Sequence, residues 1–141
     1  MGRFLGVDYG ERRVGLALSD PTAMIAQPLP TLTRRKGKRP PVAPLARIAE
    51  QHRVEGIVVG LPLTPEGEDS DWTREVRAFA GRLAERSGLP VTLQDERMTS
   101  ARAERAVRSL GLSRRKREEK ERIDAAAAVL ILQAYLDNRS T

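Results

Sequence analysis

The chain has 141 residues, no cysteine and a single histidine, His52. Without cysteine there are no disulfide frameworks, thiolate zinc sites or cysteine nucleophiles, so acid–base or metal chemistry must rest on carboxylates. The 25 Lys and Arg outnumber the 19 Asp and Glu, and the net charge of +6 favours a polyanionic partner such as nucleic acid. Aromatic residues are only 4% of the chain, which disfavours a base-stacking platform and leaves arginine contacts to phosphate.

A chain of this length is expected to fold as one domain over residues 1–141. Its longest apolar run, Ala125 to Leu132, is far shorter than the roughly 20 residues that span a bilayer, and its N-terminus lacks the apolar region of a signal peptide. We therefore expect a cytoplasmic protein without a membrane partner.

The first part of the chain predicts three strands. Residues 3–9 alternate around apolar side chains, and residues 14–19 are β-branched and apolar. Only residues 10–13 separate them, which favours an antiparallel hairpin. A third strand is expected over residues 29–32, where the neighbouring prolines confine it to the edge of a sheet.

A basic loop then leads into a helix and a buried strand. Residues 34–41 are basic and rich in breakers, and predict a loop that is either simply solvated or binds phosphate backbone through Arg35 and Lys36. Apolar residues at helical spacing predict a helix over 42–52, with His52 at its end as a surface or capping residue. The nearly continuous apolar run 54–60 is typical of a strand covered on both faces.

The second half alternates loops, helices and one more strand. Residues 61–70 form a loop rich in Pro, Gly and acid at the C-terminal end of the preceding strand, where open sheets bind ligands. A helix capped by Ser70 or Asp71 is expected to run through Arg86 and to stop at Gly88. The remaining elements expected in chain order are a strand over 90–94, a helix from Thr99 or Ser100 to about Leu110, a mixed-charge helix turn or loop over 113–122, and a last helix over 124–136.

Three acidic residues occupy positions where structure alone does not call for an acid. Asp8 lies where the first strand meets its turn, Glu96 emerges after the strand 90–94, and Asp124 opens the last helix on its apolar face. Each has a structural alternative. Asp8 can accept hydrogen bonds from its own turn, Glu96 can pair with Arg97, and Asp124 can cap its helix.

Taken together, the three acids favour a metal site. Two strand ends and a helix start can meet at one edge of a sheet, where carboxylates without a cation would raise one another's pKa. Ligands that are all oxygen select Mg²⁺ or Mn²⁺. One such ion, or a pair about 4 Å apart, can activate water and stabilise the leaving oxygen of a phosphodiester. Arg13 and Arg97 lie close in sequence to these acids and can hold the phosphate, so the pattern predicts metal-dependent phosphodiester hydrolysis.

Four blocks of sequence, in this order, resemble the YqgF family, also called RuvX, relatives of the RuvC-type resolvases in the ribonuclease H-like superfamily. Each block alone is weakly specific, and the four in order are strongly specific. They are Gly6 to Gly10 with Arg13 to Ala17, Ile57 to Pro62 with Gly67, Asp95 to Thr99, and Ile123 to Ala128 with Ile131 to Gln133.

The resemblance implies an α/β, ribonuclease H-like mixed sheet of five strands, the first three antiparallel, flanked by helices. It implies that Asp8, Glu96 and Asp124 form the metal-binding triad and that Arg13 and Arg97 contact phosphate. It further implies an endonuclease that matures the 5′ end of pre-16S rRNA or, alternatively, a Holliday junction resolvase. A resolvase needs a homodimer, whereas a monomer suffices to trim one strand.

Two segments depart from the family pattern, namely the acidic loop Glu66 to Trp72 and the arginine-rich segment before Asp124. Two other functions also compete with the nuclease interpretation. A non-catalytic nucleic-acid-binding module would carry the same basic charge as this chain. A phosphotransferase would share the Asp-x-Gly turn at Asp8, but a chain this short has no room for its second phosphate loop and adenosine site.

Overall fold

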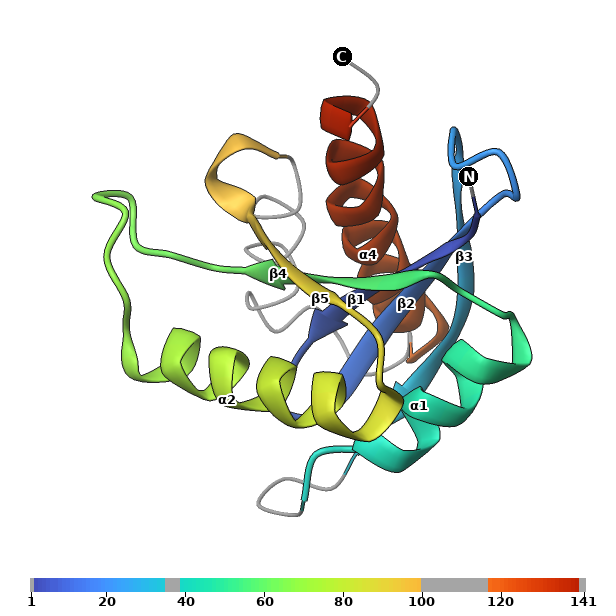
Figure 1. Ribbon diagram of the computed structural model, residues 1–141. Helices are drawn as coiled ribbons and strands as arrows, with labels where there is room; N and C mark the ends of the chain where they lie inside the picture. The colour runs from blue at the N-terminus through green and yellow to red at the C-terminus, as the bar shows by residue number, and fades with distance from the viewer. Residues whose placement is uncertain (1, 35–38, 100–116, 140–141) are drawn as a thin grey trace.

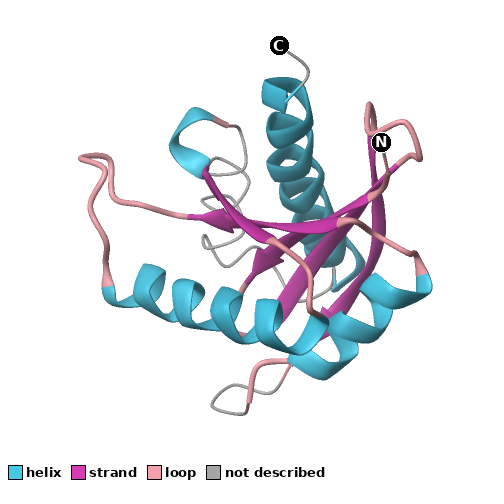
Figure 2. Cartoon of the chain, in the orientation of Figure 1, coloured by secondary structure: helices cyan, strands magenta, loops and turns pink. Residues whose placement is uncertain are grey.

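The computed structural model describes residues 2–34, 39–99 and 117–139. A five-stranded sheet forms the centre, with helices on both of its faces (Figures 1 and 2). The elements are β1 (Phe4–Tyr9), β2 (Arg13–Ser19), β3 (Ala26–Thr33), α1 (Val42–Gln51), β4 (Gly56–Leu61), α2 (Asp71–Ser87), β5 (Val91–Asp95), the 3₁₀ helix η1 (Glu96–Met98) and α4 (Arg117–Arg139).

The sheet is mixed, in the order β3-β2-β1-β4-β5. The strands β1, β2 and β3 are antiparallel neighbours, whereas β4 runs parallel to both β1 and β5. The predicted mixed sheet with three antiparallel strands is therefore confirmed. β3 is longer than expected, because an edge strand tolerates Pro28 and Pro30 when their missing N–H groups are not needed by a second neighbour.

Two hydrophobic cores lie on the two faces of the sheet. Alternate residues of a strand point to opposite faces, so Leu5 and Val7 of β1 pack with α1 and α2, and Phe4 packs with α4. Figure 1 shows α1 and α2 together on one side of the sheet and α4 on the other. All six residues of β4 are buried, as expected for a strand covered on both faces.

The ends of α1 and α2 follow the predicted signals. Ser70 caps α2, since its Oγ accepts a hydrogen bond from Thr73 N while Thr73 Oγ1 accepts one from Ser70 N. Gly88 ends the helix in the left-handed conformation with φ of 71°, which glycine adopts without strain. His52 is the C-terminal cap of α1, as expected.

The last helix starts earlier than predicted. α4 begins at Arg117, so Asp124 lies inside the helix, and the expectation that Asp124 opens or caps it is wrong. The part of the mixed-charge run from 117 to 122 is helical because Glu, Lys and Arg all have good helix propensity. The helix expected up to Leu110, together with Arg35 and Lys36, falls outside the described residues. None of the helices in the described ranges combines the length and apolarity that crossing a membrane requires.

Candidate active site

Asp8 lies near the end of β1, on the sheet face that α4 covers. It is in phase with Phe4, which packs under α4, and out of phase with Val7, which packs under α1 and α2. None of the Asp8 surface is exposed. A carboxylate without access to water costs several kcal/mol unless it is paired or coordinated, so the neighbours of Asp8 determine its role.

Glycines flank Asp8 on both neighbouring strands. Gly15 of β2 is directly opposite Asp8 in the antiparallel register. The parallel register pairs Val7 with Val59, so the next residue of β4, Gly60, lies beside Asp8. Directly opposite residues place their Cβ positions roughly 5 Å apart on the same face. The two glycines therefore leave space on both sides of Asp8 that other parts of the chain fill.

Asp124 of α4 fills the space above Gly15. A Cβ atom on Gly15 would lie 2.6 Å from the carbonyl carbon of Asp124 and 3.2 Å from its Cβ, so only glycine allows the helix this close. Asp124 is fully buried, and Arg13 donates from Nε to Asp124 Oδ2 at 2.6 Å. The Arg13 side chain keeps 23% exposure, so its guanidinium bridges a buried carboxylate and the surface.

Glu96 fills the space above Gly60. It opens η1 directly after β5, and only 1% of its surface is exposed. A Cβ atom on Gly60 would lie 2.8 Å from Glu96 Oε2 and 2.5 Å from Ile131 Cδ1 of α4. The carboxylate of Glu96 thus lies on the same sheet face as Asp8, over the adjacent strand.

The structure therefore places Asp124, Asp8 and Glu96 in one buried row over β2, β1 and β4. Arg13 offsets part of the negative charge of this row. Across residues 2–34, 39–99 and 117–139, no three Asp, Glu or His side chains already stand grouped as a metal centre. The donors themselves are all carboxylate oxygens, the ligand type that Mg²⁺ and Mn²⁺ prefer.

Arg97 directly follows Glu96 in η1 and is held by Asp95, the last residue of β5. Its Nε donates to Asp95 Oδ2 at 3.0 Å and its Nη2 donates to the same oxygen at 2.7 Å, while its backbone N–H donates to Oδ1 at 2.9 Å. These hydrogen bonds raise the pKa of the Arg97 guanidinium. Gly67, with φ of 83°, packs against the same group, since a Cβ there would lie 2.7 Å from Arg97 Nη1. The loop after β4 and the end of β5 thus jointly orient Arg97.

An aromatic stack supports the strand end from the opposite face. The Tyr9 ring stacks on Phe79 at a centroid distance of 4.0 Å and on Trp72 at 5.4 Å. Arg34 lies over the same ring at 4.9 Å and donates from Nη1 to Gly10 O at 3.2 Å. Burial raises the pKa of the Tyr9 hydroxyl, and Arg34 opposes that change. The residue after Asp8 is therefore firmly packed, which fixes the position of Asp8.

A sequence model of the RuvX family, described as Holliday junction resolvase, matches residues 2–138. The chain belongs to the RuvX family. It is 48% identical to a protein of Koribacter versatilis named "Putative pre-16S rRNA nuclease", over 98% of this chain and 88% of the relative. A protein of Chloroflexus aggregans with the same name is 44% identical, over 96% of this chain and 93% of the relative.

A solved structure supports the fold. The RuvC of Thermus thermophilus in complex with a Holliday junction substrate aligns with a TM-score of 0.57, 17% identity, and coverage of 99% of this chain and 96% of that chain. At that identity the likeness concerns the fold alone. The ribonuclease H-like fold and the RuvX family membership expected from the sequence are confirmed.

Sequence reasoning missed the residues that shape the site without supplying its charge. Gly15 and Gly60 make room for two of the carboxylates, and an isolated glycine within an apolar strand signals such close approach. Asp95 orients Arg97, and the Asp-x-Arg spacing at a strand end is its signal. Gln133 ties α4 to the sheet by accepting from Ala26 N at 2.9 Å, for which spacing carries no signal.

Proposed function

We propose that this RuvX-family chain is an endonuclease that hydrolyses phosphodiesters in structured nucleic acid with the help of Mg²⁺ or Mn²⁺. The observation that carries the proposal is the buried row of Asp124, Asp8 and Glu96, in which two glycines make room for carboxylates on both sides of a third. Burying three acids together is costly for a fold, and a bound cation would offset that cost.

In this proposal Asp8, Glu96 and Asp124 hold the ion and are the catalytic residues. When bound, the ion supplies an activated water and stabilises the leaving oxygen. Arg13 offsets the charge of Asp124 and, because part of its guanidinium reaches the surface, can also contact phosphate. Arg97, oriented by Asp95, presents a second guanidinium to the substrate. Arg35 and Lys36 are proposed to contact the backbone further from the cut.

The proposed substrate is the 5′ end of pre-16S rRNA, which places the enzyme in the cytoplasm. The names of the relatives from Koribacter and Chloroflexus support this choice. Trimming one strand requires a single active site, so a monomer would suffice.

The second candidate is cleavage of a Holliday junction, and the description of the family favours it. Cutting two strands of a junction symmetrically requires two active sites, hence a homodimer. The two candidates therefore differ in both substrate and assembly. Purified protein should be tested on a pre-rRNA 5′ fragment and a four-way junction side by side, with its solution mass measured under the same conditions.

The decisive variant is Asp8→Asn, with Asp71→Asn as control because Asp71 is an exposed carboxylate on α2. Asp8→Asn should slow cleavage at least about 100-fold, equivalent to about 2.7 kcal/mol of barrier. In EDTA its melting temperature should equal or exceed that of the wild type, because one charge leaves a crowded buried row. Full cleavage by Asp8→Asn, or by the wild type in EDTA, contradicts the proposal. Salt-sensitive binding without any cleavage by the wild type would identify a non-catalytic binding module.

A further inference from the structure

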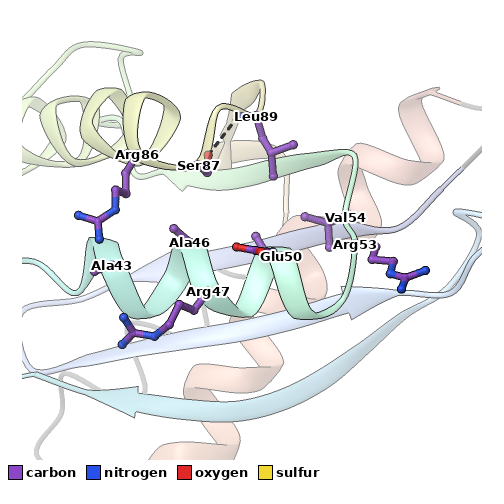
Figure 3. Close-up of a pocket in the computed structure, with 10 residues that line it drawn as sticks. Ala43, Ala46, Arg47, Glu50, Arg53, Val54, Arg86, Ser87 and Leu89 are labelled. Atoms are coloured by element: carbon purple, nitrogen blue, oxygen red, sulfur yellow. Dashed lines mark hydrogen bonds between the residues drawn. The ribbon is translucent and has the colours of Figure 1, made fainter.

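A hollow lined by arginines lies between α1 and α2, on the sheet face opposite Asp8. Its volume is about 490 Å³. Figure 3 shows Arg86 extending from α2 toward α1, with Arg47 of α1 at the same end of the hollow and Arg53 at the other end. Small apolar side chains of α1 also line it, namely Ala43, Ala46 and Ala49.

A second hollow adjoins the first. Its volume is about 620 Å³, and it shares Ala43 and Arg86 with the first. It adds Arg39, which precedes α1, and Arg82, one helical turn before Arg86. We call the two hollows together the α1–α2 groove. Its five arginines are Arg39, Arg47, Arg53, Arg82 and Arg86.

The charge of the α1–α2 groove is strongly one-sided. Its five arginines are all exposed, and Glu50 is its only acidic lining residue among those that the structure describes. Within the same described ranges, none of the five forms an ion pair with a carboxylate. The first half of α2 differs, since Arg74 pairs with Asp71 and Arg77 pairs with Asp69. Unbalanced like charges facing one another across a groove favour a polyanionic ligand.

The lining chemistry selects phosphate over nucleobase. No aromatic side chain is among the described lining residues, so bases have no surface on which to stack. Guanidinium groups bind phosphate oxygens bidentately. A ligand with regularly spaced phosphates would meet arginines from both helices, whereas a single phosphate would meet only one or two. The groove therefore suits a sugar–phosphate backbone.

The groove also leads toward the candidate active site. Arg82 acts electrostatically on Tyr9, whose ring Arg34 covers at 4.9 Å from its centroid. Tyr9 directly follows Asp8 in β1, and its side chain lies on the groove side of the sheet while Asp8 faces α4. Arg34 and Arg82 thus place positive charge on the groove side of the end of β1, and Glu75 offsets part of it.

We propose that the α1–α2 groove is a second nucleic-acid site, which binds the phosphate backbone of the substrate at a distance from the cut and independently of its base sequence. This inference rests on the proposed nuclease function, because it assigns the groove to the same substrate. Its ligand class is a phosphodiester polyanion, and its contacts are guanidinium to phosphate.

The test measures binding of a fluorescent RNA duplex, about 30 base pairs long, to Asp8→Asn protein at several salt concentrations. Arg47→Ala with Arg86→Ala removes two groove contacts, and Arg74→Ala with Arg77→Ala removes the same charge from paired positions on α2. The groove pair should reduce the magnitude of the negative slope of log affinity against log salt by about 1.8, taking roughly 0.9 per phosphate contact as for a DNA duplex. That change corresponds to tens of fold weaker binding at about 0.1 M salt. The control pair should change the slope much less.

Equal slopes for the groove pair and the parent would overturn the proposal, as would equal losses in both pairs, which would indicate net charge alone. A change in solution mass without a change in slope would instead assign the groove to a contact between protein copies. Thermal melts of all variants verify folding. Because binding is measured without cleavage, failure here differs from failure of the nuclease function, which cleavage of the same RNA by the wild type tests separately.

Discussion

Replacing Gly15 with alanine tests whether close contact between α4 and β2 builds the carboxylate row. A Cβ atom on Gly15 would overlap the carbonyl oxygen of Asp124 and lie 2.6 Å from its carbonyl carbon. These are backbone atoms, so no side-chain rotation relieves the clash. The helix itself must move outward to restore ordinary contact distances.

The free energy of unfolding should fall by about 3 kcal/mol, the upper end of the usual range for overpacking, because the contact is with rigid backbone. For a domain of this size each kcal/mol shifts the melting temperature by roughly 2–4 °C, so Gly15→Ala should melt about 10 °C below the wild type. Moving α4 also carries Asp124 away from Asp8. If the proposed row binds Mn²⁺, the ion should raise the melting temperature of the wild type and leave that of the variant unchanged.

Gly81→Ala is the matched control, because Gly81 lies within α2 and a Cβ there would meet nothing within 4 Å. Because alanine has a higher helix propensity than glycine, Gly81→Ala should stabilise the protein by about 0.5–1 kcal/mol. Circular dichroism melts with and without Mn²⁺ measure both effects. If Gly15→Ala melts within about 2 °C of the wild type, or keeps the full Mn²⁺ shift, the reasoning about α4 is refuted.

Two further predictions concern the neighbours of the row. In Gly60→Ala the new Cβ meets the carboxylate of Glu96 and Ile131 Cδ1 rather than backbone, so the free energy of unfolding should fall by only about 1–2 kcal/mol while the proposed Mn²⁺ binding weakens. Calorimetric titration with Mn²⁺ measures this, and unchanged affinity would count against Glu96 as a ligand. Asp95→Asn weakens the charge-assisted hydrogen bonds that orient Arg97, and should slow single-turnover cleavage roughly tenfold, with Arg97→Ala slower still and Arg77→Ala near the wild type. Equal rates for Asp95→Asn and the wild type would exclude the positioning role.

Local signals explain what could be predicted of the fold. The caps of α2 at Ser70 and Gly88 depend on residues a few positions apart, so the pattern located both ends. The start of α4 was mistaken because a mixed-charge run suits a solvated helix as well as a loop. The extent of β3 was underestimated because proline lowers strand propensity everywhere, whereas only an interior strand must exclude it.

The candidate site was predictable in its acids but not in their arrangement. Asp8 and Glu96 stood out because Asp8 lies near the end of an apolar strand and Glu96 directly follows the last strand. The ion pair of Arg13 with Asp124 joins residues 111 positions apart, and sequence spacing carries no information about such a contact. Sequence spacing is equally uninformative about the position of Asp124 over Gly15 and of Glu96 over Gly60, because both depend on how α4 and η1 pack.

The alternation of β1 relates the two proposed sites to each other. Consecutive residues of a strand face opposite sides of the sheet, so Asp8 joins the carboxylate row under α4 while Tyr9 joins the arginine side under α2. A substrate that contacts both sites must pass around the end of β1, where Gly10 and Arg34 lie. A short fragment spanning only the cut would reach the carboxylates without reaching the groove. The groove should therefore matter more as the duplex beyond the cut lengthens, so that the proposed enzyme would prefer long duplexes over short fragments.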